Sequence, residues 1–250
     1  MEHRILLETY LKRLKLPAMF AHYQEMARQA EQGNQTFEGY LLALVEIESQ
    51  HRDENAFKRR LSQAKFPLSK TLDQFDFSAI PSLNKAKALN LAQGDYINKK
   101  ENVILMGNSG TGKTHLATAL GLIACQQGKK VRFLTAAGLI NQLTEAQAGL
   151  RLSQVQRTLA NLDLLIIDEI GYVPFTQRGA ELFFQVSADS YERQSIIMTT
   201  NLEFSKWPQV FHSEQLTGAL LDRLTHHAHI FTMNGESYRF KQSMSQKKTI

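Results

Sequence analysis

The feature that most constrains the fold is an eight-residue segment between a predicted strand and a predicted helix. Residues 107–114 read Gly-Asn-Ser-Gly-Thr-Gly-Lys-Thr and match the phosphate-binding pattern G-x-x-x-x-G-K-[ST] at every fixed position. An apolar run over residues 102–106 precedes the segment, and a helical pattern over residues 115–126 follows it. Phosphate-binding segments occur in this order of strand, loop and helix, so a glycine-rich turn without chemical purpose is disfavoured.

The residue types in this segment have distinct expected tasks. The glycines let consecutive backbone N–H groups turn toward phosphate oxygens, at the positive end of the following helix. Lys113 supplies a point charge for the β- and γ-phosphates, and the hydroxyl of Thr114 is the expected Mg²⁺ ligand. We therefore predict that ATP with Mg²⁺ is held by Gly107, Asn108, Ser109, Gly110, Thr111, Gly112, Lys113 and Thr114.

Two later apolar runs also end in polar residues. Residues 164–167 are all apolar and lead into Asp168 and Glu169, and the run over residues 195–200 leads into Asn201. Ligands of open α/β sheets bind at the carboxyl ends of the strands. Asp168 is therefore expected to hold Mg²⁺, and Glu169 to orient or deprotonate an attacking water. The two acids could instead cap the next helix, a weaker alternative beside a matched phosphate-binding segment.

Five short runs of β-forming residues alternate with helix-length segments in the second part of the chain. They cover residues 102–106, 130–134, 164–168, 195–200 and 229–233. Such alternation is typical of parallel strands joined by helical crossovers. We therefore predict an α/β fold with a mostly parallel five-stranded sheet.

The first 66 residues have apolar residues at helical spacing and no convincing strand pattern. Pro17 interrupts one stripe, and Thr36 is placed to cap a long helix that runs to Pro67. The expected apolar face of that helix carries Phe37, Tyr40, Leu41, Leu44 and Val45. We predict an all-helical domain over residues 1–66 and a nucleotide-binding domain over 67–250, with 67–100 as a packed linker and 243–250 as a flexible tail.

The basic residues are unevenly distributed along the chain. The formal net charge of +5 permits a polyanionic partner without demanding one. Residues 52–70, however, contain six basic and only two acidic residues, and residues 237–250 contain four basic and no acidic residues. The charge pattern therefore points to two candidate contact regions for a polyanion.

Composition also excludes several classes of protein. The single cysteine, Cys125, excludes a disulfide framework and any site built from several cysteines. The longest uncharged apolar runs are too short to span a bilayer. The start carries the acid Glu2, and only three apolar residues follow it before Glu8, so no signal-peptide core is expected. We expect a soluble, cytoplasmic protein without a membrane partner.

Several motifs in a set order resemble one branch of the AAA+ ATPases. The phosphate-binding segment is followed by the run ending in Asp168-Glu169, by Thr-Thr-Asn at 199–201, by Leu-Asp-Arg-Leu at 221–224 and by Ser-Tyr-Arg at 237–239. This order resembles the DnaC and DnaA branch. Within that branch, two segments resemble the IstB-like proteins. They are Asp-Glu-Ile-Gly-Tyr-Val-Pro-Phe at 168–175 and Gly-Lys-Thr-His-Leu-Ala at 112–117. These are ATP-dependent helpers encoded beside the transposase of bacterial insertion sequences, and the likeness covers nearly the whole chain.

The resemblance implies further catalytic residues besides Glu169. Asn201 corresponds to the sensor-1 residue, Arg223 to an arginine finger and Arg239 to sensor 2. A finger reaches the γ-phosphate of a neighbouring subunit, so hydrolysis would require a homo-oligomer. On the residues alone, Arg223 could instead pair with Asp222, and Arg239 could belong to the basic tail.

Other residues are open to two interpretations. Phe75 and Phe77 precede the phosphate-binding segment, where adenine contacts of this family often lie, although core packing is the stronger explanation for them. His226, His227 and His229 form a dense group, but no cysteine or acid stands at ligand spacing, so a metal site is disfavoured. Their closeness to Arg223 favours a subunit interface instead.

The first basic cluster provides candidate contacts to the DNA backbone. These are Arg52, Lys58, Arg59, Arg60 and Lys65. A solvated helix face explains their charge equally well. The resemblance favours DNA, because IstB-like proteins form ATP-dependent assemblies on target DNA and hand it to the transposase. No signature of base readout is visible in the sequence, so we expect binding to duplex DNA with little sequence preference.

Taken together, the residue patterns predict an ATPase, and the resemblance to the IstB-like proteins implies that it regulates DNA transposition. It would oligomerise on duplex target DNA with ATP, hydrolyse ATP at subunit interfaces and deliver the target to its cognate transposase. The alternative is a DnaC-like helicase loader of DNA replication, whose ATPase core would look almost identical; the sequence at 171–175 favours the IstB-like reading. A small-molecule phosphotransferase is disfavoured because nothing resembles an acceptor pocket or an arginine-rich lid.

Overall fold

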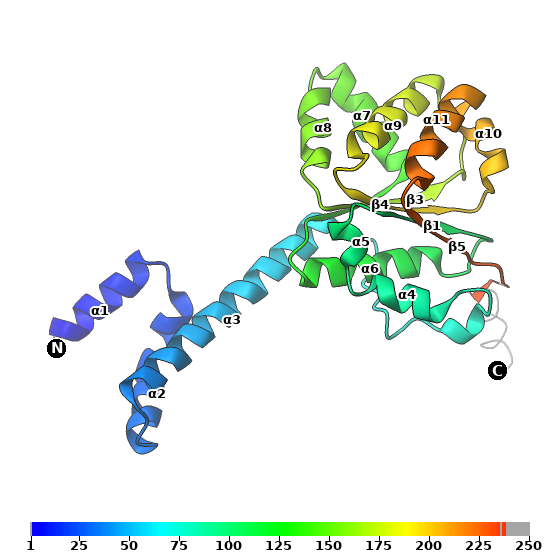
Figure 1. Ribbon diagram of the computed structural model, residues 1–250. Coiled ribbons are helices and arrows are strands. Elements are labelled where there is room, and N and C mark those ends of the chain that lie inside the picture. The colour runs from blue at the N-terminus through cyan, green and yellow to red at the C-terminus, as the bar shows by residue number, and fades with distance from the viewer. Residues whose placement is uncertain (1, 236, 239–250) are drawn as a thin grey trace, which may run out of the picture. The chain divides into compact units, whose positions relative to one another are not determined.

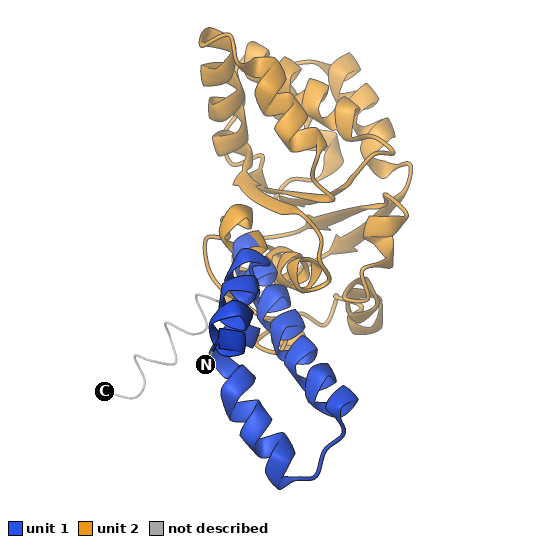
Figure 2. Cartoon of the chain, turned by 90° about the vertical axis from the view of Figure 1, so that its left-hand side faces the viewer, with its two compact units in different colours: residues 1–59 blue, residues 60–250 orange. Residues whose placement is uncertain are grey.

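A computed structural model of the chain describes residues 2–235 and 237–238. The chain divides into two compact units, residues 1–59 and 60–250 (Figure 2). The division falls inside helix α3 (Phe37–Ala64), whereas the sequence placed it after residue 66. The last part of α3 belongs to unit 2 because Ala64 is fully buried and the Arg60 guanidinium donates to the Cys125 carbonyl at 2.8 Å.

Unit 1 consists of three helices, as expected for this part of the chain. They are α1 (Glu2–Arg13), α2 (Pro17–Gln32) and the first part of α3. Pro17 begins α2, where its missing N–H costs no hydrogen bond. The Thr36 hydroxyl accepts from the Gly39 N–H at 3.1 Å, which confirms its predicted place at the start of α3.

A buried carboxylate joins two of these helices. Glu48 on α3 is only 4% exposed and accepts hydrogen bonds from the Ala18 and Met19 N–H groups in the first turn of α2 and from Arg52. Burial by itself would raise the pKa of Glu48, but the bonds from Arg52, Met19 and Ala18 outweigh it and hold the pKa below its ordinary value. Glu48 therefore stabilises the α2–α3 pair as an anion.

The predicted apolar face of α3 was wrong for most of its members. Tyr40 and Leu44 pack with Leu11 and Tyr23 in the core of unit 1, whereas Phe37, Leu41 and Val45 are exposed. Helix residues four apart share one stripe, so Tyr40 and Leu44 face the other helices together while the stripe one residue further round faces away. Helical spacing alone does not say which of two adjacent apolar stripes is covered.

Unit 2 contains a five-stranded sheet whose strands run in the order β2-β3-β4-β1-β5, and every pairing is parallel (Figure 1). The strands are β1 (Asn102–Met106), β2 (Val131–Thr135), β3 (Leu164–Ile170), β4 (Ser195–Thr200) and β5 (Ala228–Thr232). The predicted α/β fold with a mostly parallel five-stranded sheet is confirmed. Parallel strands align their carboxyl ends, so β1, β3 and β4 deliver the residues that follow them to one edge of the sheet.

Helices cover both faces of this sheet (Figure 1). One face carries α4 (Lys85–Leu91), α5 (Asp95–Asn98) and α6 (Lys113–Gln126), and η1 (Phe77–Ala79) precedes them. The other face carries α7 (Ala136–Ala148), α8 (Leu152–Ala160), α9 (Gln177–Ser190), α10 (Pro208–Phe211) and α11 (Glu214–Thr225), with η2 (Phe204–Lys206) before α10. No helix among the described residues is long and apolar enough to cross a membrane.

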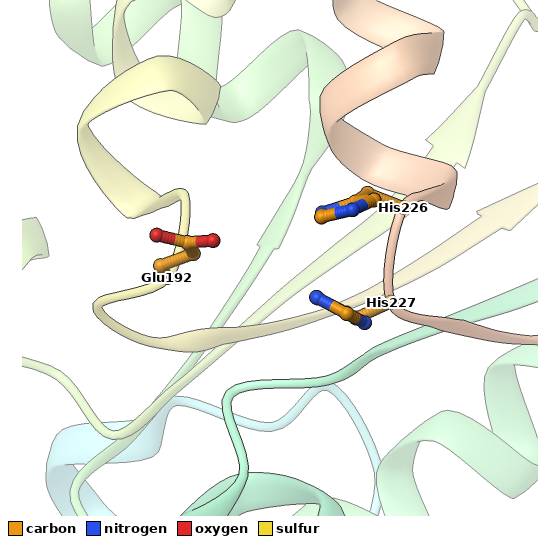
Figure 3. Close-up of side chains that lie close together, drawn as sticks. All are labelled: Glu192, His226 and His227. Atoms are coloured by element: carbon orange, nitrogen blue, oxygen red, sulfur yellow. The ribbon is translucent and has the colours of Figure 1, made fainter.

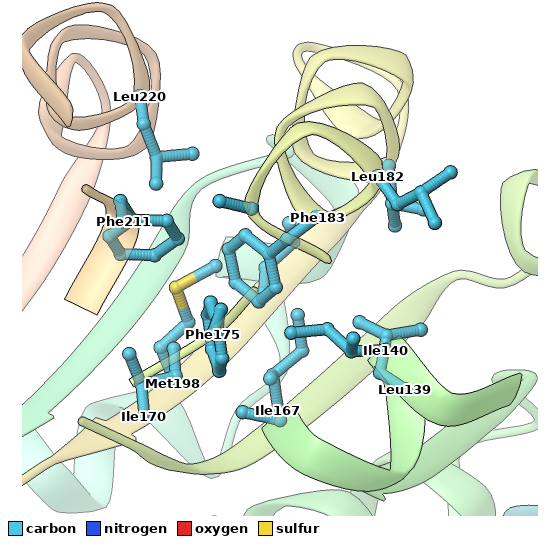
Figure 4. Packing of buried hydrophobic residues seen from close by; sticks show 14 of the residues in the cluster. Leu139, Ile140, Ile167, Ile170, Phe175, Leu182, Phe183, Met198, Phe211 and Leu220 are labelled. Atoms are coloured by element: carbon cyan, nitrogen blue, oxygen red, sulfur yellow. The ribbon is translucent and has the colours of Figure 1, made fainter. Parts of the chain in front are cut away.

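One extensive hydrophobic core lies between the sheet and this second group of helices (Figure 4). Phe175, Phe183 and Phe211 pack ring against ring, with centroids 5.2–5.6 Å apart. Ile167 of β3 and Met198 of β4 lie beneath them and are almost fully buried. This packing fixes the ends of β3 and β4, from which the functional side chains extend.

Candidate functional site

A cleft of about 320 Å³ lies at the carboxyl edge of the sheet. Residues 109–114 of the phosphate-binding loop and the following His115 line it, together with Glu169, Tyr172 and Thr199 at the strand ends. The segment before β1 contributes further lining, including Phe75 and Ile80. Its size and its mixed polar and apolar lining suit a small-molecule ligand.

The phosphate-binding loop joins β1 to α6, as the sequence predicted. Gly112 has φ +81° and directly precedes α6, so the loop turns sharply into a helix N-terminus whose first N–H groups lack helical partners. Gly107 has no room for a side chain, since a Cβ there would lie 2.1 Å from the Met233 carbonyl oxygen. The loop therefore presents backbone N–H groups and a positive helix end to an anion.

Lys113 lies inside this loop and is only 6% exposed. Its ammonium donates to the carbonyls of Gly107 at 2.7 Å and Asn108 at 2.6 Å. These bonds hold the ammonium charge of Lys113 against the loop that presents its N–H groups to an anion. A buried ammonium at a helix N-terminus is suited to phosphate oxygens, the role expected for Lys113.

The two predicted Mg²⁺ ligands meet in the structure. The Thr114 hydroxyl lies 3.0 Å from both carboxylate oxygens of Asp168, which is almost fully buried. A hydroxyl and a carboxylate are oxygen donors of the kind Mg²⁺ prefers. The donor set therefore fits a magnesium ion bound between the phosphate-binding loop and β3.

Glu169 lines the same cleft, although adjacent residues of a regular strand point to opposite faces. Pairing between β3 and β4 shifts register between Ile167 and Ile170, and Glu169 has φ +64°. A left-handed residue at such a bulge re-aims its side chain, at a cost of about 1–3 kcal/mol. The bulge lets Asp168 stay buried against Thr114 while the Glu169 carboxylate is exposed in the cleft.

Thr199 connects these two acids, a role that was not expected from the sequence. Its hydroxyl donates to the Asp168 carboxylate and accepts from the Glu169 N–H at 2.9 Å. It therefore holds the buried carboxylate and also fixes the backbone of the bulge. The available sequence signal was the Thr-Thr-Asn strand end, which a predicted β3–β4 pairing would have placed beside the two acids.

We expect Thr199→Val to slow ATP hydrolysis by about 10–100-fold, because a hydrogen bond to a charged group contributes roughly 1.5–3 kcal/mol. The half-saturating Mg²⁺ concentration should rise as well, since Asp168 loses the bond that orients it. Single-turnover hydrolysis at varied Mg²⁺ measures both effects. Thr200→Val is the control, because it removes a buried hydroxyl of the same strand that donates to the Ile170 carbonyl. Equal Mg²⁺ dependence in the two variants would contradict this role for Thr199.

Two of the other predicted catalytic residues, Asn201 and Arg223, are not part of the cleft lining that the described residues form. Asn201 follows β4 beside Gly171, where a glycine Cβ would lie 3.4 Å from its Oδ1. Arg223 lies on α11, donates to the Ala219 carbonyl at 3.0 Å and sits 5.0 Å from the Phe184 ring centroid. Neither belongs to the cleft lining over residues 2–235 and 237–238. Arg239 lies outside the described residues.

The aromatic rings of Phe75 and His115 are part of the cleft lining. Phe75 is 7% exposed, lines the cleft and packs edge-on against Phe77 at 4.8 Å and His115 at 5.2 Å. A ring nitrogen of His115 lies 2.8 Å from the Thr71 carbonyl. Burial lowers the pKa of His115 below its ordinary value, so its ring is neutral at pH 7. Phe75 is thus a core residue that also lines the cleft, and a contact between its ring and adenine stays a prediction.

The five candidate DNA contacts fall into two groups. Arg52 is engaged with Glu48 at 3.0 Å and with the Lys15 carbonyl at 2.9 Å, and Arg60 donates to Cys125. Lys58, Arg59 and Lys65 are exposed, and Lys58 lies 3.7 Å from Glu54. Of the five side chains, Arg59 and Lys65 are exposed without an ion pair to any described residue, whereas Lys58 shares its charge with Glu54.

The chain matches the family described as IstB-like ATP binding protein over residues 9–246. It is 37% identical to a protein of Geobacillus stearothermophilus described as the ATP-binding protein of insertion sequence IS5376, over 96% of this chain and 95% of the relative. It is 38% identical to the corresponding protein of insertion sequence IS21 of Pseudomonas aeruginosa, over 94% of this chain and 89% of the relative.

Solved structures share the fold at lower identity. The AMPPCP-bound DnaA of Aquifex aeolicus matches with a TM-score of 0.56 and 21% identity, over 74% of this chain and 56% of DnaA. The DnaC helicase loader matches with a TM-score of 0.51 and 20% identity, over 68% of this chain and 99% of the loader. These similarities confirm the AAA+ fold of the nucleotide-binding part.

Proposed function

Because the chain belongs to the IstB-like ATP-binding protein family, we propose that it is an ATPase of DNA transposition that assembles on duplex DNA and delivers it to a transposase. One observation carries the ATPase assignment: the phosphate-binding loop and Glu169 line one cleft, and Thr114 of that loop lies 3.0 Å from the buried Asp168 carboxylate. The relatives named after insertion sequences support the link to transposition.

Each part of the cleft has a task in hydrolysis. The N–H groups at the start of α6 and the Lys113 ammonium bind the phosphates of ATP. Thr114 and Asp168 hold Mg²⁺, whose charge offsets that of the β- and γ-phosphates when bound. The Glu169 carboxylate orients the attacking water and accepts its proton. Thr199 keeps both acids in place for these tasks.

The position of Arg223 supports hydrolysis at a subunit interface. Its guanidinium lies on α11, outside the lining of the cleft in the described part of its own chain. An arginine that stabilises the transferred phosphoryl group must reach it, so Arg223 would act on the cleft of a neighbouring copy. Assembly and catalysis are then coupled.

The exposed cations of the first basic cluster support contact with DNA. Lys58 and Arg59 lie on α3, and Lys65 directly follows it. Exposed lysine and arginine side chains neutralise phosphates without reading bases, so binding would depend on charge rather than sequence. The transposase would meet the resulting protein–DNA assembly.

Nucleotide-dependent assembly on duplex DNA tests the proposal as a whole. We expect the protein to form large oligomers on a DNA fragment of several hundred base pairs with a non-hydrolysable ATP analogue, and not with ADP. Negative-stain electron microscopy and sizing by light scattering measure this. Lys113→Ala is the control, since it removes the phosphate-binding ammonium and should prevent assembly. Identical oligomers with ATP analogue, ADP and no nucleotide would contradict the proposal.

Replacing Lys58 and Arg59 by alanine should weaken DNA binding evenly across sequences. We expect the slope of log affinity against log salt to fall by about one for each phosphate contact removed. Fluorescence anisotropy with a labelled duplex at several salt concentrations measures the slope. Lys12→Ala with Lys15→Ala is a charge-matched control in unit 1. An unchanged slope in the first variant would assign Lys58 and Arg59 to a solvated helix face.

The helicase-loader alternative has weaker support than the transposition proposal. The DnaC helicase loader shares the fold of this chain, but the relatives of higher identity named here are insertion-sequence proteins. DnaC matches at 20% identity, which shows the fold alone, whereas the insertion-sequence relatives match at 37–38% over more than nine-tenths of the chain. Pull-down of the cognate transposase or of the replicative helicase by the ATP-bound oligomer distinguishes the two. Capture of the helicase and not of the transposase would contradict the proposed role in transposition and favour helicase loading.

A further inference from the structure

Three metal-ligating side chains from two separate segments meet on the surface of unit 2 (Figure 3). Glu192 stands in the turn between α9 and β4, and His226 and His227 directly follow α11. One ligand atom from each residue lies within 4.8 Å of the other two. All three side chains are exposed, so an ion can reach them from solvent.

The expectation that no acid stands near these histidines was wrong. No acid lies at ligand spacing along the sequence, but the fold brings Glu192 to His226 from an earlier turn of the chain. It also separates His229, whose ring nitrogen lies 2.8 Å from the Glu101 carboxylate. His226 and His227 therefore form a cluster with Glu192, whereas His229 contacts Glu101.

Local contacts hold the pair in place. The His226 and His227 rings lie with centroids 4.0 Å apart. The Tyr191 hydroxyl lies 2.8 Å from Nδ1 of His226, which leaves the second ring nitrogen for a ligand bond. Metal-bound histidines commonly hydrogen-bond through their other nitrogen in this way. In addition, His226 stands at the carboxyl end of α11, where the helix dipole favours a cation.

We propose that Glu192, His226 and His227 bind a divalent transition-metal ion of the zinc type. Two imidazoles and one carboxylate match the donors that Zn²⁺ takes in proteins, whereas Mg²⁺ prefers oxygen ligands alone. Ligands at about 2.0–2.2 Å from a tetrahedral ion lie roughly 3.3–3.6 Å apart, so the three side chains must move slightly closer together. Exposed side chains do so by small rotamer changes. The remaining coordination position stays open to water.

The test of the metal site does not depend on ATPase activity, although His226 lies three residues after Arg223. The site requires neither nucleotide nor DNA, and it shares no residue with the cleft. Its failure in a binding experiment would leave the assignment of the cleft unchanged, and loss of ATPase activity would not bear on it.

Zinc binding by the full-length protein tests the proposal. Tag-free protein is freed of metal with EDTA, desalted and titrated with ZnCl₂ against a chromogenic chelator; Co²⁺ absorption then reports nitrogen and oxygen coordination. We expect one Zn²⁺ per chain, bound to wild type and to His229→Ala alike. Loss of a partner outside the ligand shell already weakens metal affinity by about 10–100-fold, so His227→Ala and Glu192→Gln should weaken it at least tenfold.

Tyr191→Phe provides a milder variant that keeps all three ligands. We expect it to bind Zn²⁺ about tenfold more weakly, because it removes the hydroxyl beside Nδ1 of His226. Circular dichroism melting checks that each variant is folded. Wild-type affinity in a folded His227→Ala, or equal weakening in His229→Ala and His227→Ala, would overturn the proposal.

Discussion

Replacement of Glu169 by glutamine should stop ATP hydrolysis while ATP binding remains. The amide keeps the shape of the side chain in the cleft but cannot accept a proton from water. Loss of a general base lowers a rate by about 10²–10⁴-fold. A coupled phosphate-release assay gives the rate, and equilibrium binding of a fluorescent ATP analogue gives the affinity, which should change little.

The matched control is Glu181→Gln, which neutralises an exposed acid that pairs with Arg178 on α9. It should hydrolyse ATP at the wild-type rate. Glu169→Gln should also remain on duplex DNA after ATP addition, because assembly follows binding and disassembly follows hydrolysis in the proposed function. Normal turnover in Glu169→Gln would overturn the catalytic role of this carboxylate.

Replacement of Arg223 by alanine should reduce hydrolysis even further, by about 10³–10⁵-fold, the effect of an arginine finger on phosphoryl transfer. The cleft of the same chain stays complete, so the affinity for ATP should change little. Arg193→Ala, which removes an exposed arginine after α9, is the control for lost charge in unit 2.

A mixing experiment separates an interface role from a structural one. In a mixture of Arg223→Ala and Glu169→Gln proteins, some interfaces combine the intact Glu169 of the first variant with the intact Arg223 of the second. Hydrolysis should therefore return when two inactive proteins are combined with DNA. If the variants assemble together and the mixture stays inactive, Arg223 does not act on a neighbouring subunit. In that case its contacts with Ala219 and Phe184 describe a structural residue.

Local sequence determined much of this protein. The apolar runs predicted each of the five strands to within a few residues, because a parallel sheet covered on both faces needs continuous apolar strands. The segment 107–114 specified its own turn and helix N-terminus, since only glycine tolerates the conformation and the close approach of Met233. The Thr114–Asp168 pair followed from the same logic, because parallel strands bring their carboxyl ends together.

Other features depended on contacts between segments far apart in the sequence. The boundary between the units moved into α3 because Arg60 and Ala64 pack with unit 2, a preference that helical spacing does not record. The stripe with Phe37 and Leu41 is exposed for a similar reason, because contacts with other helices decide which apolar stripe of α3 is covered.

The sequence by itself determined the phosphate-binding loop, the strands and the two acids, because each depends on residue types at short, fixed spacing. Only the tertiary structure decided how these acids are used and which histidines meet an acid. The bulge at Glu169 and the hydroxyl of Thr199 arise from the pairing of β3 with β4. The meeting of Glu192 with His226 likewise depends on how α9 and α11 end on the sheet. Residues distant along the chain become partners only when packing fixes the strands and helices that carry them.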